Sequence, residues 1–301
     1  MKHHQLNALV AVADQGSFHG AARALHLTQP AITKAIKDLE AELGVLLVTR
    51  QARGVELTTE GKTLLVRARL IVRELRRARE DIGQLKGNRD GKLTIGVTPL
   101  AGLTIVPRAF AQFRAAWPKV KVDFIEYTSD QLFVQLRSGG LDFAVGVTTG
   151  GTDKTPVHQE ELLSLPTALT VHRNSPLARC QSLAELRHAE WLHTDLTERF
   201  PIFLAELFAR EGLEPPLRVT RCTSQALFHS LAMTNDVVFF WSLYAISMPE
   251  LRKRFMALPL SIDLPRITIK LLFREDSLLT SAAAYFVRCI RDITDSEWAA
   301  L

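Results

Sequence analysis

The sequence predicts a mixed α/β protein whose parts follow one another along the chain. Residues 1–60 have the pattern of short helices and a hairpin, and residues 59–87 that of one long helix. From Gly91 onward, short apolar strands alternate with helices, which indicates an α/β domain with a largely parallel sheet. Apolar residues make up 47% of the 301 positions, enough for packed cores.

The N-terminal part begins with a helix that ends at Gly16. Its apolar residues recur at helical spacing. They are Leu6, Leu9, Val10 and Ala13. Ser17 is suited to cap a second helix over residues 18–25. After a short turn, Thr28 can cap a third helix, with Pro30 in its first turn, where a missing N–H costs little.

The third helix has one apolar and one polar face. The apolar residues are Ile32, Ile36, Leu39 and Leu43, and we expect them to form one buried stripe. The polar residues Gln29, Thr33, Lys34 and Lys37 then point elsewhere. Two short helices joined by a tight turn, the second with a polar face, indicate a helix-turn-helix that fits the DNA major groove. The alternative is a three-helix scaffold whose polar face is only solvated.

A short hairpin follows this helix. Residues 46–50 and 55–58 flank a tip at 51–54, and Arg50 and Arg53 lie near it, as in a wing that contacts phosphates. Residues 1–61 contain six basic and six acidic side chains, so the positive groups must be arranged locally. The excess positive charge of the first 90 residues lies in the long helix, which favours a polyanion as partner.

The long helix has an apolar seam with alternating spacings of four and three. Its members are Leu64, Ala68, Ile71, Leu75, Ala78, Ile82 and Leu85. A heptad stripe of this length predicts a coiled-coil dimer, and the alternative is that it packs on the chain's own C-terminal domain. Arg69, Arg76 and Arg77 flank the seam, where they either pair with acids elsewhere or lie near DNA phosphates.

The C-terminal part is expected to contain six strands and five helices. The strands are Leu93–Val97, Val120–Glu126, Phe143–Val147, Ala168–His172, Val237–Phe240 and Ile267–Phe273. The helices are Leu103–Trp117, Asp130–Ser138, Ile202–Glu211, Ser224–Thr234 and Ser281–Asp292.

Several classes of protein are disfavoured by the sequence. It has no apolar run long enough for a membrane helix and no convincing signal peptide, and its three widely spaced cysteines fit a cytoplasmic location without a metal site. No serine-hydrolase elbow, P-loop or zinc-protease motif occurs, so we expect neither an enzyme nor a cofactor. A transport-type solute-binding protein would need an export signal and no helix-turn-helix. A DNA-binding protein without a ligand stays open.

The first 61 residues resemble the LysR-type transcriptional regulators nearly position for position. The matching residues are Gly16-Ser17-Phe18, Ala21-Ala22, Leu25, Leu27 to Thr33, Ile36, Leu39-Glu40, Leu43-Gly44, Leu47, Arg50 and Leu57 to Gly61. Thr28 and Thr33 stand where serine is usual, and both keep the hydroxyl. The chain length and the strand-helix pattern of the C-terminal half also fit this family.

The resemblance implies three parts and their partners. They are a winged helix-turn-helix over residues 1–59, a linker helix over 60–90 and an effector-binding domain over 91–301. The last would have two subdomains, about 91–162 with 267–301 and about 163–266, similar to periplasmic solute-binding proteins. The expected partners are a dyad-symmetric double-stranded DNA site, a second copy through the linker helix and a tetramer built from two such dimers, with RNA polymerase as a further candidate.

The resemblance also suggests the site residues. Those expected to face DNA are Gln29, Pro30, Ala31, Thr33, Lys34 and Lys37, with Arg50 and Arg53 in the wing and Ser17 at a phosphate. In sheets of this kind, ligands bind beyond the carboxyl ends of strands and near helix N-termini. That rule selects an effector set of Thr98, Pro99, Leu100, Thr128 and Ser129 on one side and Thr194, Phe200, Thr223 and Ser224 on the other.

This effector set predicts a small organic anion, an aromatic or short-chain carboxylate or sulfonate. Hydroxyls and helix N–H groups would hold its charge, and Phe200 with Leu100 would cover an apolar ring. Because the set contains no lysine or arginine, we expect a singly charged ligand rather than a phosphate. For each hydroxyl taken alone, a purely structural helix cap is the alternative.

Overall fold

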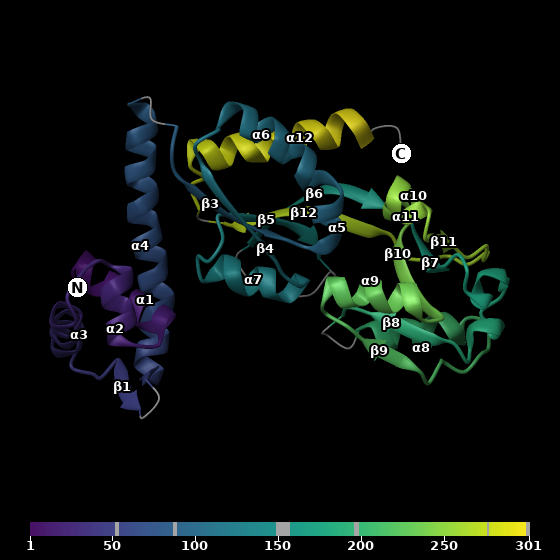
Figure 1. The fold of residues 1–301 in the computed structure, drawn as a ribbon, viewed down its shortest axis with the longest axis horizontal. Helices are drawn as coiled ribbons and strands as arrows, with labels where there is room; N and C mark the ends of the chain where they lie inside the picture. Colours follow the sequence, from purple (N-terminus) through teal and green to yellow (C-terminus); the bar gives the residue numbers. More distant parts are fainter. Residues whose placement is uncertain (52–53, 87–88, 149–156, 196–198, 276, 299–301) are drawn as a thin grey trace.

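The computed structural model describes residues 1–51, 54–86, 89–148, 157–195, 199–275 and 277–298. Three helices and a hairpin form the N-terminal part, and a long helix separates it from the rest of the chain (Figure 1). These elements are α1 (His3–Gln15), α2 (Phe18–Ala24), α3 (Gln29–Leu43), β1 (Val48–Gln51), β2 (Gly54–Leu57) and α4 (Thr59–Leu85).

The local sequence explains where the N-terminal helices start and stop. Ser17 caps α2 by accepting a hydrogen bond from the Gly20 amide at 3.0 Å, and Thr28 caps α3 through the Ala31 amide at 3.4 Å. Gly16 and Gly44 end α1 and α3 in the left-handed region, with φ values of 63° and 70°. The helix end expected at Gly16 and the caps expected at Ser17 and Thr28 are therefore confirmed.

The N-terminal core lies between the three helices and the start of α4. Ile32, Ile36 and Leu39 are buried there as predicted, together with Ala68 of α4. Leu43 was expected to complete this stripe, but it is 39% exposed. It lies in the last turn of α3, next to the Gly44 cap, where the chain turns away from the other helices.

Within the described residues, the C-terminal part contains two five-stranded sheets. The first has the order β4 (Lys121–Glu126), β3 (Lys92–Val97), β5 (Phe143–Val147), β12 (Ile267–Arg274), β6 (Val157–Leu165). The second has the order β11 (Phe255–Ala257), β7 (Thr167–His172), β10 (Val237–Ser242), β8 (Glu190–His193), β9 (Val219–Arg221).

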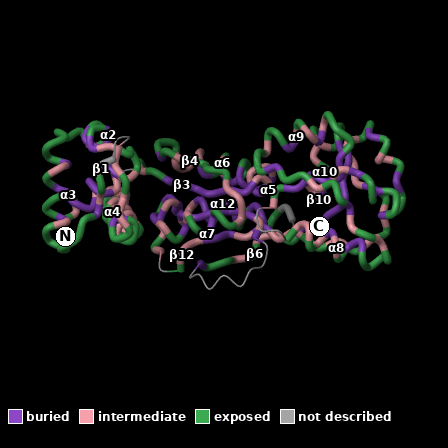
Figure 2. Tube along the Cα trace, turned by 90° about the horizontal axis from the view of Figure 1, so that it is seen from below, coloured by how far each residue is buried: buried purple, intermediate pink, exposed green. Residues whose placement is uncertain are grey.

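Helices cover both sheets. Those of the first are α5 (Pro99–Leu103), α6 (Ile105–Ala116), α7 (Ser129–Arg137) and α12 (Ser281–Trp298). Those of the second are α8 (Arg199–Ala209), α9 (Gln225–Thr234), α10 (Leu243–Ser247), α11 (Pro249–Arg252) and the 3₁₀ turns Pro176–Arg179 and Ala184–Leu186. Buried segments run through the strands of each sheet (Figure 2). On the first sheet Phe113 of α6 stacks on Phe286 of α12, with ring centroids 4.7 Å apart.

The prediction of a largely parallel sheet is wrong, because both sheets are mixed. β3 pairs in parallel with β4 and β5, and β8 with β9 and β10, but β12 runs antiparallel to β5 and β6. The antiparallel strands are those that cross between the sheets. The chain leaves the first sheet at Leu165, enters the second at Thr167 and returns with Ile267. The Thr167 hydroxyl donates to the Pro265 carbonyl at 2.6 Å and ties the two crossings together.

The expected helix Leu103–Trp117 is confirmed as α6, but it begins two residues later than expected, at Ile105. A separate short helix, α5, precedes it, and the two meet at Thr104 in a non-helical conformation with φ −112° and ψ −81°. The Thr104 hydroxyl donates back to the Leu100 carbonyl at 2.7 Å. Such local bonding competes with a continuous helix.

Among the described helices, none combines the length and apolar character that a bilayer crossing requires.

Candidate functional sites

The exposed face of α3 forms the first candidate site. Gln29, Pro30, Thr33, Lys34 and Lys37 border a shallow concavity of about 600 Å³, together with Asp38. Ala31, also predicted to face DNA, is exposed on the first turn of the same helix. The structure thus brings the six predicted α3 residues onto one accessible surface, with two lysine charges and polar groups at the helix's amino-terminal end.

Ser17 and the hairpin flank this surface differently. The Ser17 oxygen accepts the hydrogen bond that caps α2, and within the described part of the chain no group accepts from its hydroxyl proton. The hairpin is held near its tip, where the Val55 amide donates to the Gly16 carbonyl at 3.0 Å. Arg50 lies on β1 opposite Val55, while its side chain and the whole of Arg53 lie outside the described residues.

The apolar seam of α4 is only partly covered within the chain. Leu64 and Ala68 pack against the N-terminal core, whereas Ile71, Leu75 and Ile82 are 41%, 41% and 55% exposed. The alternative that this stripe packs on the chain's own C-terminal domain is therefore wrong for these three residues. The side chain of Leu85 lies outside the described residues.

The arginines beside the seam pair with acidic residues. Arg69 pairs with Asp14 of α1, and Arg76 with Glu80 at 3.4 Å. Arg77 contacts both Glu74 and Asp142 at 2.7 Å. Of the two roles considered for these arginines, the structure supports pairing with acids.

The predicted effector residues on the first sheet follow the carboxyl ends of β3 and β4. Thr98 is buried, and its hydroxyl oxygen accepts from the Val147 amide at 3.1 Å, while the Ser129 hydroxyl donates to the Val147 carbonyl at 2.6 Å. Both residues are thus brought together at the end of β5. Pro99 begins α5 and Leu100 is buried. Thr128 directly precedes α7 and is half-buried, and its hydroxyl has no hydrogen-bond partner among the described residues.

The predicted residues on the second sheet lie at the carboxyl ends of β8 and β9. Thr194 and Thr223 are exposed, and Ser224 caps α9 by accepting from the Leu227 amide at 3.4 Å. The Phe200 ring stacks on His193 with centroids 4.5 Å apart.

Sequence reasoning missed other polar groups at the same strand ends. The hydroxyls of Thr148, after β5, and Ser242, ending β10, are buried without a hydrogen-bond partner among the described residues. Such groups normally require a partner, such as a water or a ligand. Arg221 ends β9 in register with His193, so this edge carries an arginine that the predicted effector set did not include. The strand-end rule could have selected Thr148 and Ser242, and it would have selected Arg221 had β9 been recognised.

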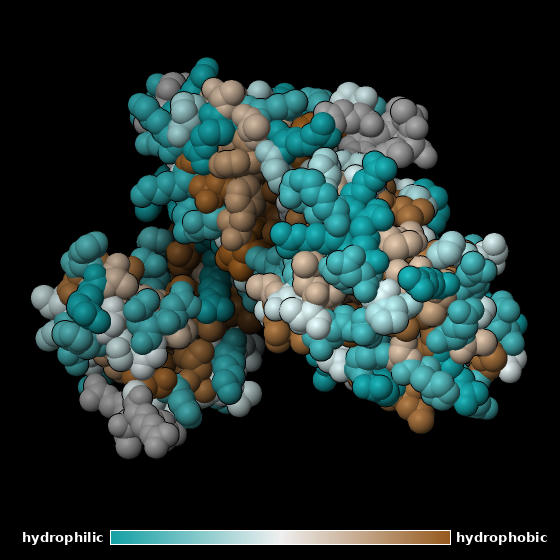
Figure 3. All heavy atoms as spheres, turned by 45° about the vertical axis from the view of Figure 1, so that its right-hand side comes forward, coloured by the Kyte–Doolittle hydropathy of each residue, from teal (hydrophilic) through white to brown (hydrophobic). Residues whose placement is uncertain are grey.

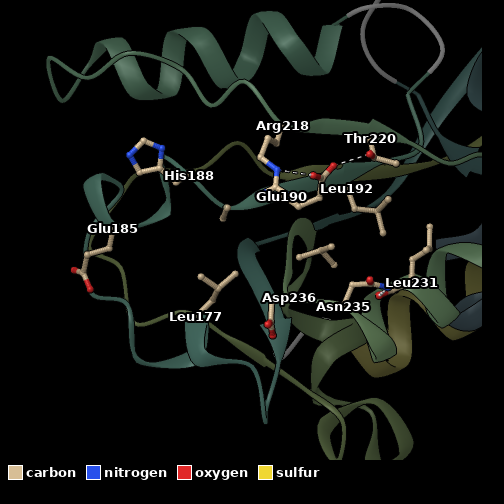
Figure 4. Close-up of a pocket in the computed structure, with 12 residues that line it drawn as sticks. Leu177, Glu185, His188, Glu190, Leu192, Arg218, Thr220, Leu231, Asn235 and Asp236 are labelled. Atoms are coloured by element: carbon tan, nitrogen blue, oxygen red, sulfur yellow. Dashed lines mark hydrogen bonds and ion pairs between the residues drawn. The ribbon is translucent and has the colours of Figure 1, made fainter.

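A separate cavity lies at the opposite ends of the second sheet's strands (Figure 4). Its volume is about 640 Å³, and its walls include Leu231 and Asp236. Glu190 forms part of one wall. Its carboxylate accepts a hydrogen bond from the Thr220 hydroxyl at 2.6 Å and forms an ion pair with Arg218 at 3.3 Å. Glu190 and Val237 begin their strands, whereas the predicted effector residues follow strand ends. No residue of the predicted effector set therefore lines this cavity.

A capped helix-turn-helix, a wing and a long helix joined to a two-sheet α/β domain define a class of ligand-responsive DNA-binding regulator. Residues 3–62 match the bacterial regulatory helix-turn-helix protein, lysR family, and residues 86–295 match the LysR substrate binding domain. The chain therefore belongs to the LysR family of DNA-binding transcriptional regulators.

Known members of the family are similar along nearly the whole chain. The DNA-binding transcriptional dual regulator OxyR of Escherichia coli is 29% identical, covering 97% of this chain and 96% of OxyR. The regulator GalR of Pseudomonas putida is 27% identical, covering 96% of this chain and 73% of GalR. Full-length CbnR complexed with its target DNA has 24% identity and a TM-score of 0.66, covering 97% and 99% of the two chains.

Proposed function

We propose that the chain binds an extended dyad-symmetric DNA site as a homo-oligomer, through α3, Ser17 and the wing arginines Arg50 and Arg53. The observation that carries this proposal is the single accessible surface formed by Gln29, Thr33, Lys34 and Lys37 on a helix of suitable size for the major groove. Residues 1–59 would bind DNA, 60–90 would dimerise and 91–301 would sense the effector. Its subdomains would be 91–162 with 267–301, and 163–266.

The test is DNA binding as a function of salt. A duplex selected from a random pool should be bound with an affinity that falls steeply between low and high salt, because each phosphate contact releases counterions. An affinity that stays flat over that range would contradict the proposed interface.

The proposed effector is a small organic anion held between the carboxyl-terminal strand edges of the two sheets. Thr98 and Ser129 meet at Val147, the Thr148 and Ser242 hydroxyls are buried without a partner, and Arg221 lies on the facing sheet's strand end. Because this edge includes Arg221, the lack of a basic residue in the predicted set no longer argues for a singly charged ligand.

Thiol-based sensing is not supported by the cysteines, although relatives include a hydrogen peroxide-inducible genes activator. Cys180, Cys222 and Cys289 are free and buried. Burial raises the pKa of the Cys180 and Cys289 thiols, which disfavours the reactive thiolate.

The family is one of transcriptional regulators, and we propose that the chain acts without catalysis. We further propose that it acts at the chromosome in the cytoplasm and that RNA polymerase is a further partner.

A further inference from the structure

One side chain on the exposed face of α3 differs in charge from its neighbours. Asp38 borders the same concavity as Lys34 and Lys37, and it is exposed. It lies about 14 Å further along the helix than Gln29, which corresponds to about four base-pair steps of DNA. A carboxylate therefore occupies one end of the surface that is proposed to read the major groove.

The other carboxylates of α3 have partners within the chain, whereas Asp38 has none among the described residues. Glu40 accepts at Oε1 from the Leu47 amide at 2.8 Å, and Glu42 contacts the amino group of Met1. Hydrophilic residues cover much of the N-terminal part on the face seen in Figure 3, so exposure alone does not distinguish Asp38. Its distinguishing features are the free carboxylate and its place in the concavity.

The helix itself gives no reason for an aspartate at this position. Aspartate has a low helix propensity, and Asp38 lies in the carboxyl-terminal half of α3, where a negative charge gains nothing from the helix dipole. Close to DNA phosphates, its charge would also weaken binding to every sequence alike. In Figure 1, α3 lies at the outer edge of the N-terminal part, away from the effector-binding domain. These two costs are offset only if the carboxylate makes a favourable contact with bound DNA.

The chemistry of a carboxylate selects one base. Ionised aspartate only accepts hydrogen bonds. In the major groove, guanine presents two acceptors, and thymine presents one acceptor and a methyl group, whereas cytosine presents the N4 amino donor. Adenine also presents an amino donor, but its N7 acceptor lies beside that donor and repels a carboxylate. Asp38 therefore fits cytosine, and Lys34, one helical turn before it on the same face, suits the acceptors of the paired guanine.

We propose that Asp38 is a specificity-determining residue that accepts a hydrogen bond from the N4 amino group of a cytosine in each half of the DNA site. This role rests on the proposed DNA interface of α3 and adds one base to those that the interface reads. Because the carboxylate also repels the phosphates of any duplex, its removal should weaken discrimination and strengthen binding to unrelated DNA. Removal of a lysine from the same face should instead weaken binding.

The experiment compares the bases that three full-length chains select from one pool of randomised duplexes. The chains are the wild type, Asp38→Asn and Glu42→Gln. Asp38→Asn keeps the size of the side chain and replaces the carboxylate with an amide, which pairs with N6 and N7 of adenine. We expect cytosine at one position of each half-site for the wild type and adenine there for Asp38→Asn, with the other positions unchanged. Glu42→Gln removes an exposed carboxylate outside the concavity and should select the wild-type site.

Fluorescence anisotropy with two duplexes that differ only at that base pair then measures the size of the effect. The wild type should prefer the cytosine duplex by about 5- to 150-fold, the range of one good contact to a base, and Asp38→Asn should prefer the adenine duplex. Asp38→Ala should lose the preference and bind a scrambled duplex more tightly than the wild type does.

An unchanged base preference in Asp38→Asn overturns the proposal, and so does a uniform gain in affinity without a change of preference. Both outcomes leave the proposed DNA interface intact, because the wild type still selects a site. If the wild type selects no common site, the interface itself is wrong, and the role of Asp38 falls with it.

Discussion

At the scale of residues, we expect the side chains on α3 to divide into those that read bases and those that supply charge. Thr33 and Lys34 lie in the middle of the exposed face. Thr33→Ala or Lys34→Ala should each cost about 1–3 kcal/mol on the preferred duplex and much less on a scrambled one. Fluorescence anisotropy with both duplexes measures this difference, and Lys119→Ala, an exposed lysine of the effector-binding domain, is the control. Equal weakening on both duplexes would assign these residues to phosphate contacts instead.

His229 gives the protein a pH-dependent stability. Burial, with a smaller contribution from Arg254, lowers the pKa of His229 below its ordinary value of 6.5. As the pH falls, the unfolded chain is therefore protonated at this histidine before the folded chain. The contribution of His229 to the free energy of unfolding is complete above about pH 6.5 and is lost as the pH drops through the pKa of the folded state.

Urea denaturation at about pH 8 and about pH 5 tests this contribution. His229→Asn should lose less stability on acidification than the wild type, because the protonation it removes no longer favours the unfolded chain. His188→Asn, at an exposed position, controls for loss of a histidine. An identical acid loss in wild type and His229→Asn would show that His229 is not responsible.

Single residues also show which features of the sites could be predicted from the sequence. The caps at Ser17 and Thr28 follow from local chemistry and could be predicted. The role of Thr98 could not, because its bond to the Val147 amide joins residues 49 positions apart. A hydroxyl after a strand suits a ligand or a neighbouring strand equally well, and only the tertiary fold decides.

At the scale of elements, α4 has an apolar seam that the single chain covers only in part. Ile71 and Leu75 of this seam are each 41% exposed. Apolar residues at this spacing are typical of a coiled-coil partner. Ile71→Asp or Leu75→Asp would place an unpaired charge in that interface, at a cost of several kcal/mol.

Sedimentation of the full chain measures this effect. Ile71→Asp should sediment as a smaller species than the wild type, whereas Lys62→Asp, which introduces the same charge at an exposed position off the seam, should not. If the wild type and Ile71→Asp have the same size, the oligomer is held by another surface.

The elements missed by the sequence share a physical cause. β9 and β11 have only three residues each and β8 has four, too short for an alternating pattern to emerge. β6 was missed because its middle, His158 to Glu161, is polar and mostly exposed. Long helices and buried strands such as β5 were predicted well, since their apolar period extends over enough residues.

For the whole molecule, the two sheets share only the crossing strands as continuous connections. β6 leads into β7 through Pro166, and β12 returns beside β6 over eight paired positions. We expect the sheets to change their mutual angle at these crossings while each keeps its core. A ligand that prefers one angle would then shift the population towards it.

The effector prediction follows from this arrangement. Small aromatic and aliphatic carboxylates and sulfonates, screened against the full chain, should include one that raises the unfolding temperature. A ligand at about 100 times its dissociation constant adds about 2.7 kcal/mol of stability. Thr128→Val should weaken that stabilisation, because it removes a polar group at the amino end of α7, where helix N–H groups favour an anion.

Thr234→Val is the matched control, since Thr234 is exposed at the carboxyl end of α9. Its hydroxyl donates to the Ser230 carbonyl at 2.9 Å and accepts from the Asn235 side chain at 2.9 Å, so it forms local hydrogen bonds only at the end of that helix. An anion that stabilises the wild type and both variants equally would bind away from the α7 terminus. The cavity lined by Glu190 and Asp236 would then be the next place to examine, and Asp236→Asn would test it, because removing a negative charge from its wall should strengthen binding of an anion there.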